Sequence, residues 1–336
     1  MTTVTSTPNR TAPSGTAPRS LLSGMPWLVW RQHRAAFLTM LAITAAALVW
    51  IGYQRGQMTD YLSGYGWPHS LSDEWRNDFQ QQGGQWLDAT GGALRVIPVL
   101  LGVFIGAPLF AQDIEQGTAK LIASQSAGRT RWLATKLGMT ALVLVICTTV
   151  LSIAFAWWWG PVRTETAFAI TWTSGTAFDV TGPVPVALTL FTVAGGMAIG
   201  VLLRRTLISM VVTFGFVIAV QGVWEYVRLA LGDVVTVRTP GVDRDALASV
   251  PDGAYVLDHS YYTGSGRLLG WSTCQTEETE QAMDVCMRKA DVVGWSVDYL
   301  PISQMPAMQW LGAAILLALT GAITAFVFFW GRKRLV

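Results

Sequence analysis

The residues best suited to carry function lie in a charged stretch between two long apolar runs. Residues 110–136 read FAQDIEQGTAKLIASQSAGRTRWLATK, and glycines at 117 and 128 permit turns at either end of the segment between them. Apolar side chains flanked by charges suit docking onto a protein surface better than making or breaking bonds. The alternative is an amphipathic connector whose Lys and Arg side chains only fix the topology. The residues alone leave both interpretations open.

Residue sets that would indicate other chemistry are absent from the sequence. It contains no G-x-x-x-x-G-K-[ST] loop to cradle phosphates, and no H-E-x-x-H, G-x-S-x-G or C-x-x-C motif. The three histidines (His33, His69 and His259) are far apart along the chain. We therefore expect no catalytic residue, no metal site and no cofactor in this chain, and no nucleic-acid partner.

Composition assigns the chain to a membrane. It has 336 residues, of which 51% are hydrophobic and 13% charged, whereas soluble domains carry about 25% charged residues. Six apolar runs are long enough to cross a hydrocarbon core, and only helices satisfy their backbone groups there. The runs cover residues 35–53, 93–110, 137–159, 183–203, 206–227 and 308–330. The sequence thus predicts an all-α polytopic membrane protein with six transmembrane helices.

Charge distribution predicts the orientation of these spans. With the N-terminus inside, the inner segments are 1–34, 111–136, 204–205 and 331–336, which hold 13 basic and 2 acidic residues. The remaining segments hold 10 basic and 19 acidic residues. Because Lys and Arg accumulate on the cytoplasmic side, both termini are expected in the cytoplasm.

The segments outside the spans divide further. Residues 1–24 are rich in Thr, Ser, Pro and Ala and are expected to be a disordered cytoplasmic tail. Residues 25–34 mix Trp and Arg on one side of a helix, which suits either an interfacial helix or an ordinary positive flank of the first span. Residues 160–182 are expected to form a short outer loop, and residues 331–336 a basic cytoplasmic tail.

The largest outer segment, residues 228–307, lies just before the last span. The sequence at 258–266 (DHSYYTGSG) suggests turns, and that at 277–290 (EETEQAMDVCMRKA) suggests a helix. Cys274 and Cys286 lie in this segment, where oxidation is permitted, so they either form a disulfide or remain two thiols. One continuous helix would hold them too far apart, so pairing requires a turn between them.

The charged stretch also resembles a known family. Glu115-Gln116-Gly117-Thr118, followed by Leu121, Ser126, Arg129 and Lys136, resembles the E-x-G-T … S-x-x-R … K pattern after the second span of type-2 ABC-transporter permeases. The six spans, the N-terminal interfacial segment and the loop before the last span are similar to that family. Residues 27–34, 106–136 and 299–334 look like permeases common in actinobacteria.

The resemblance implies a subunit without an ATP site, in the membrane of a bacterial cell. Its partners would be cytoplasmic ABC ATPase subunits, which hold ATP and Mg²⁺, a second permease copy or homologue, and membrane lipids. The loop 111–136 would contain a coupling helix that docks on the ATPase. The coupling residues would be Asp113, Ile114, Glu115, Gly117, Thr118, Lys120 and Leu121.

Three functions are then open. The first is an export permease that forms a translocation path with a second permease. The second is an ABC-type sensor or immunity subunit that signals or protects through its outer segment rather than moving cargo. The third, a membrane-embedded enzyme, lacks a visible nucleophile–base pair or metal set. Apolar spans suit lipids, hydrophobic drugs or peptides as cargo, and a homodimer and a heterodimer remain equally open.

Overall fold

Within the described residues, six helices are long and apolar enough to cross a membrane, which confirms the predicted class. The computed structural model describes residues 25–67, 69, 84–117, 129–164, 170–242 and 249–334. The predicted tail 1–24 and part of the predicted coupling loop lie outside these residues. The six candidate spans are Val29–Ser63, Gln85–Glu115, Arg131–Val162, Val184–Leu203, Thr206–Leu231 and Ile302–Trp330.

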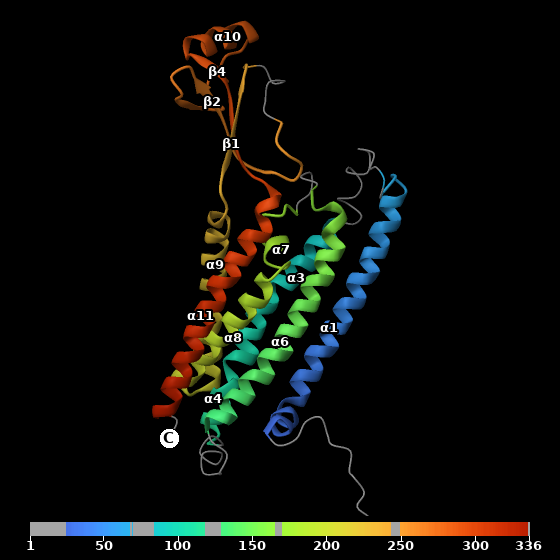
Figure 1. Ribbon diagram of the computed structural model, residues 1–336, viewed down its shortest axis with the longest axis vertical. Coiled ribbons are helices and arrows are strands. Elements are labelled where there is room, and N and C mark those ends of the chain that lie inside the picture. Colours follow the sequence, from blue (N-terminus) through green and yellow to red (C-terminus); the bar gives the residue numbers. More distant parts are fainter. Residues whose placement is uncertain are drawn as a thin grey trace, which may run out of the picture.

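The first span belongs to α1 (Met25–Ser63), which also includes the segment 25–34, for which an interfacial helix or a positive flank of the first span was expected. The two predicted pieces therefore form one continuous helix. It packs against α6 (Arg129–Trp159) at one edge of the bundle (Figure 1). Apolar side chains such as Ile43 and Val49 are exposed along it, as expected for a helix surrounded by lipid.

The second span is broken into three parts. Helix α3 (Gln85–Leu101) contains Pro98, the π-helical turn η2 (Gly102–Gly106) follows it, and α4 (Pro108–Glu115) starts with a proline. In the π turn, the Ala107 N–H donates to the Gly102 carbonyl over 3.0 Å. Proline removes a backbone donor and crowds the preceding turn, and here one proline lies within α3 while the other starts α4, on either side of the π turn.

The fourth span, α8 (Val184–Leu203), lies at the centre and contacts α3, α4, α6, α9 (Thr206–Val227) and α11 (Met305–Arg334). Glycines bring it close to the second span. A Cβ atom on Gly106, Gly196 or Gly200 would lie under 3.0 Å from a backbone carbonyl oxygen of the facing segment. Gly102 and Gly106 of the second span and Gly196 and Gly200 of α8 each have the small-xxx-small spacing, and the two pairs pack on each other within the chain.

The described residues between 228 and 307, which exclude 243–248, form a folded domain around a small sheet. The turn η4 (Arg228–Leu231) leads to strands β1 (Val235–Pro240), β2 (Tyr255–Thr263), β3 (Leu268–Gly270) and β4 (Val292–Leu300), in the antiparallel order β1-β4-β2-β3. Helix α10 (Glu280–Lys289) confirms the predicted helix. The turns suggested at 258–266 are wrong for 258–263, which belong to strand β2.

Cys274 and Cys286 are joined by a disulfide in this domain. The chain turns after Cys274, and α10 starts at Glu280, so the two Cα atoms lie 5.8 Å apart. Tyr261 and Met287 pack beside Cys274. The domain thus has its own small core, closed by the covalent bond.

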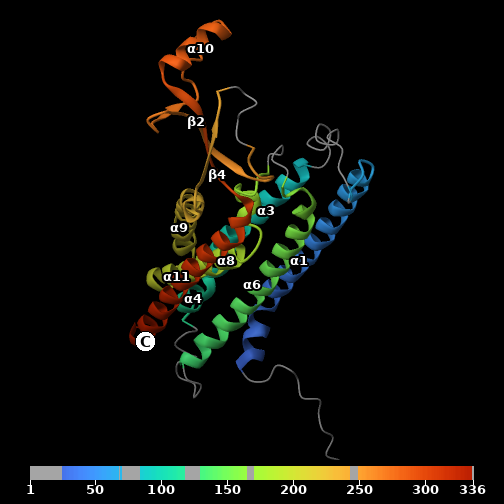
Figure 2. The same ribbon diagram turned by 45° about the horizontal axis from the view of Figure 1, so that its top comes forward.

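The sheet lies beyond one end of the bundle, where it continues from α9 and leads into α11 (Figures 1 and 2). The Asp233 N–H donates to Gln304 Oε1 and Gln304 Nε2 donates to the Asp233 carbonyl, each over 2.8 Å, just before β1 and α11 respectively. We call this the sheet end of the bundle. The opposite end, where α1 begins and α11 ends, is called the basic end after its arginines Arg31, Arg34, Arg131, Arg204 and Arg205.

The connection from α6 to α8 differs from the surface loop expected at 160–182. After the turn η3 (Gly160–Val162), residues 170–182 enter the bundle and include the short helix α7 (Gly175–Phe178). Trp172, Phe178 and Asp179 are each at most 2% exposed. We call residues 170–182 the inserted segment. Its apolar side chains are long enough to fill the space between spans, so it packs as core rather than as a solvated loop.

Candidate functional site

The predicted coupling residues are only partly described. Helix α4 carries Asp113, Ile114 and Glu115, and it ends at a turn where the Gly117 N–H donates to the Ile114 carbonyl over 3.2 Å. Gly117 has φ +73°, a conformation that strains any residue with a Cβ atom. Thr118, Lys120 and Leu121 lie outside the described residues. The glycine of the E-x-G-T pattern therefore ends α4.

Glu115 joins the end of α4 to the start of α9. Its Oε2 accepts the Thr206 backbone N–H over 2.9 Å, across 91 positions of the chain. The first N–H groups of a helix have no intrahelical acceptor, and the residue at the N-cap, Arg205, provides no side-chain cap. The Glu115 carboxylate supplies this cap, and its negative charge also suits the helix N-terminus.

Asp113 faces the interior of the bundle rather than the surface. Its side chain lies beside Lys136 of α6, with Oδ2 2.5 Å from Nζ, and the two residues are 5% and 1% exposed. Gln32 of α1 donates a longer hydrogen bond, 3.4 Å, to Asp113 Oδ1. One carboxylate thus connects α4 to α6 and α1 at the basic end.

Aromatic rings surround the buried ammonium group. Lys136 Nζ lies 5.4 Å from the ring centroids of Phe110 and Trp132, a distance that permits cation–π attraction. Burying two charges costs several kcal/mol for each ion, and their attraction offsets this only while both partners remain. The Asp113–Lys136 pair is therefore a poor source of stability and a good determinant of helix register.

A second charged cluster lies at the sheet end, around Asp179 of the inserted segment. Trp224 Nε1 donates to Oδ1 over 2.6 Å, and Arg228 Nη1 and Arg95 Nε each lie 3.1 Å from Oδ2. Glu225 pairs with both arginines. The cluster is neutral overall, and it joins α3 and α9 to the inserted segment.

Burial raises the pKa of the Asp179 carboxyl, while the Arg228 guanidinium and the Trp224 indole oppose that rise. The sequence did not predict Asp179 as a site residue, because Asp179 lies in a segment that was expected to be a surface loop. The signal available was the presence of Arg95, Glu225 and Arg228 at span ends, since such groups need partners.

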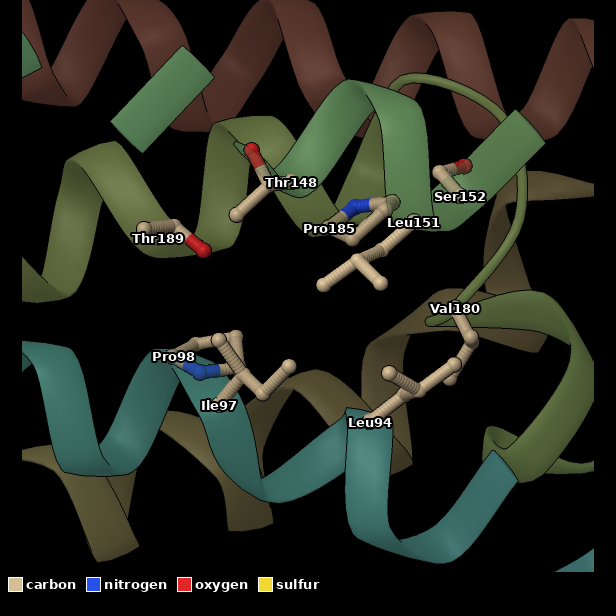
Figure 3. A pocket seen from close by; sticks show the side chains of 9 residues that line it. All are labelled: Leu94, Ile97, Pro98, Thr148, Leu151, Ser152, Val180, Pro185 and Thr189. Carbon is tan, nitrogen blue, oxygen red and sulfur yellow. The ribbon is translucent and has the colours of Figure 1, made fainter. Parts of the chain in front are cut away.

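A small cavity of about 10 Å³ lies between α3, α6 and α8 (Figure 3). Its lining is mostly apolar, with hydroxyl groups from Thr148, Ser152 and Thr189. Val180 of the inserted segment closes one side. The space is about the size of one water molecule, so it is too small to hold a cargo molecule in this structure.

A family model described as ABC-2 membrane transporter related matches residues 41–228, more than half of the chain. This chain belongs to that family. The match runs from the first span to Arg228 and stops where the sheet domain begins. No curated protein and no solved structure gives a significant match.

Family membership confirms the predicted permease and, with the six apolar helices, a multi-pass membrane protein of the ABC-transporter class. Members are membrane components of ABC systems, so association with ABC ATPase partners follows in general terms. In the part of the permease that the structure describes, no three His, Cys, Asp or Glu side chains are grouped to hold a metal ion.

Proposed function

We propose that this permease is the membrane subunit of an ATP-driven exporter and that its basic end faces the bacterial cytoplasm. A second permease completes the translocation path, and separate ATPase subunits bind ATP and Mg²⁺. Support for the orientation comes from the excess of Lys and Arg at the basic end and from the disulfide at the opposite end, which suits an oxidising compartment.

One observation carries the proposal: the end of the second span is bonded to three other spans at the basic end. Glu115 caps α9, and Asp113 holds Lys136 of α6 and Gln32 of α1. A displacement of α4 by a bound ATPase would therefore be transmitted to α1, α6 and α9 together. We assign ATPase coupling to Asp113 and Glu115 as internal transmitters, and to Ile114, Gly117, Thr118, Lys120 and Leu121 as the docking segment.

The cargo proposed is apolar. A groove of about 320 Å³ between α9 and α11 has a lining without polar surface. Such a surface suits an alkyl chain or another hydrophobic molecule. Membrane lipids or hydrophobic compounds are therefore better candidates than ions.

Transport into inverted membrane vesicles tests this function. Vesicles containing the permease and its ATPase should accumulate a fluorescent phospholipid or a hydrophobic dye when ATP is added, and vesicles with a hydrolysis-deficient ATPase should not. Active ATP hydrolysis without movement of either probe would contradict the export proposal for these two cargo classes.

The sheet domain favours a second candidate, a sensor or immunity subunit. It is folded, disulfide-bonded and outside the region matched by the family. In that case an external molecule that binds the sheet would change ATP hydrolysis in the intact complex without cargo movement. In the same vesicles the sheet domain faces the lumen. Enclosing such a molecule in the lumen and measuring both ATP hydrolysis and cargo movement separates the two functions.

A further inference from the structure

The inserted segment is held by four helices at the sheet end. Asp179 accepts hydrogen bonds from side chains of α3 and α9, and Ser152 of α6 donates to the Gly182 carbonyl over 3.0 Å. Gln309 of α11 donates to the carbonyls of Phe178 and Thr181 over 2.9 and 3.0 Å. The polar backbone of the segment is thus satisfied inside the bundle, which makes its burial possible.

Glycines allow the close fit of the segment. A Cβ atom on Gly91 of α3 would lie 2.5 Å from the Thr176 carbonyl oxygen, and one on Gly175 would overlap the Arg95 guanidinium. Gly182, with φ +66°, leaves room for the Gln309 amide. Small residues on α3 and within the segment therefore permit a close fit that larger side chains at these positions would prevent.

The segment covers the small cavity between α3, α6 and α8. Val180 lies at one side of that space, and Ser152, which bonds the segment, lines it as well (Figure 3). Thr189 of α8 is 1% exposed, its Oγ1 has no hydrogen-bond partner among the described residues, and its hydroxyl points toward the cavity. Val180 lies beside Leu94 on one side of this space, opposite Thr189, so the inserted segment lines the side of the cavity nearer to the sheet end.

The sheet domain is bonded to the same segment. Trp172 Nε1 donates to the Gly253 carbonyl over 2.8 Å, across 81 positions of the chain. Gly253 lies in the connection that leads into β2, and β1 follows η4, where Arg228 lies. Movement of the sheet would therefore act on both sides of the Asp179–Arg228 contact.

We propose that the inserted segment is the outer gate of the permease, with Asp179 as its latch and the sheet domain as the lever that releases it. The proposal rests on the proposed function, because it describes how the export path closes on the outer side. The latch is made of two cations and two anions, and water solvates all four once the segment moves. Separating these charged groups therefore requires less free energy than separating an apolar contact of the same area, because water hydrates the charges but not apolar side chains.

Thiol labelling from outside the cell tests the gate. The reporter is Thr189→Cys, placed in a Cys147→Ser background of the full chain with its ATPase, and the probe is a membrane-impermeant maleimide. With the latch intact the reporter should stay unlabelled. Asp179→Asn should raise its labelling rate roughly tenfold, because a charged hydrogen-bond network is lost while the side-chain shape is kept. Trp172→Phe, which loses the bond to Gly253, should give a smaller increase.

Asp284→Asn is the matched control, since this exposed carboxylate of α10 belongs to no part of the latch and should leave labelling unchanged. Equal labelling rates in the latch variants and this control would overturn the gate. If Asp179→Asn does not fold, Trp224→Phe decides by the same comparison, because it removes one donor to Asp179 and keeps a ring. Labelling needs no cargo, so faster labelling without export would retain the gate and reject the export function.

Discussion

At the residue scale, the basic end depends on one buried ion pair and one capping carboxylate. Asp113 and Lys136 are almost completely buried, and Glu115 reaches the first N–H of α9. The sequence pattern identified Asp113 and Glu115, but it presented both as surface groups. Their real partners, Lys136, Gln32 and Thr206, are 23, 81 and 91 positions away, so only the folded chain reveals them.

Removing one partner of the buried pair should be more harmful than removing both. Asp113→Leu or Lys136→Met alone leaves an uncompensated buried charge and should cost about 3 kcal/mol of stability. The double variant should regain most of that lost stability, because two apolar side chains leave no unpaired charge in the buried site. Thermal unfolding of the detergent-solubilised protein measures this. Additive losses in the double variant would contradict the account of the pair.

At the element scale, close contact between α8 and the broken second span determines how the bundle packs. The six spans could be predicted because apolar runs of this length rarely occur outside transmembrane helices. The π turn could not, since nothing in the local pattern distinguishes it from an ordinary helix. The inserted segment was missed for a related reason: its Thr, Gly and Asp residues look like a loop until Asp179 meets two arginines.

Gly196→Val tests the helix contact. Its side chain would collide with the Gly102 carbonyl, where a Cβ atom already lies at 2.5 Å, so overpacking should lower stability by roughly 2 kcal/mol or more. Gly215→Val on α9, where a Cβ atom has no neighbour within 4 Å, is the matched control and should be nearly neutral. Melting temperatures compare the two, and equal losses would argue against this packing.

At the scale of the whole molecule, the permease consists of a family bundle and an added sheet domain. The sheet joins α9 and α11 at the sheet end, whereas α4, which leads to the predicted docking segment, ends at the basic end. From the sequence, the outer segment 228–307 was expected to contain turns, a helix and two cysteines able to form a disulfide. The sequence did not reveal strands, because their pairing is set by residues as far apart as Val235 and Tyr299.

The disulfide should stabilise the sheet domain without affecting the bundle. Replacing Cys274 and Cys286, 12 positions apart, with serine removes a cross-link worth about 3 kcal/mol in a loop of this size. We expect faster proteolysis between 264 and 290 in the variant. The melting temperature of the helical bundle should stay unchanged. A lower melting temperature of the bundle in this variant would show that the two parts unfold together.

Coupling at Glu115 is the central claim, and ATP hydrolysis by the reconstituted complex tests it most directly. The quantity measured is the stimulation of the ATPase by the permease at equal binding of the two subunits. We predict that Glu115→Ala lowers this stimulation roughly tenfold, because the bond from α4 to α9 is lost. Glu280→Gln, an exposed glutamate of α10, should have no effect. Unchanged stimulation in Glu115→Ala, with the subunits still bound, would contradict the account.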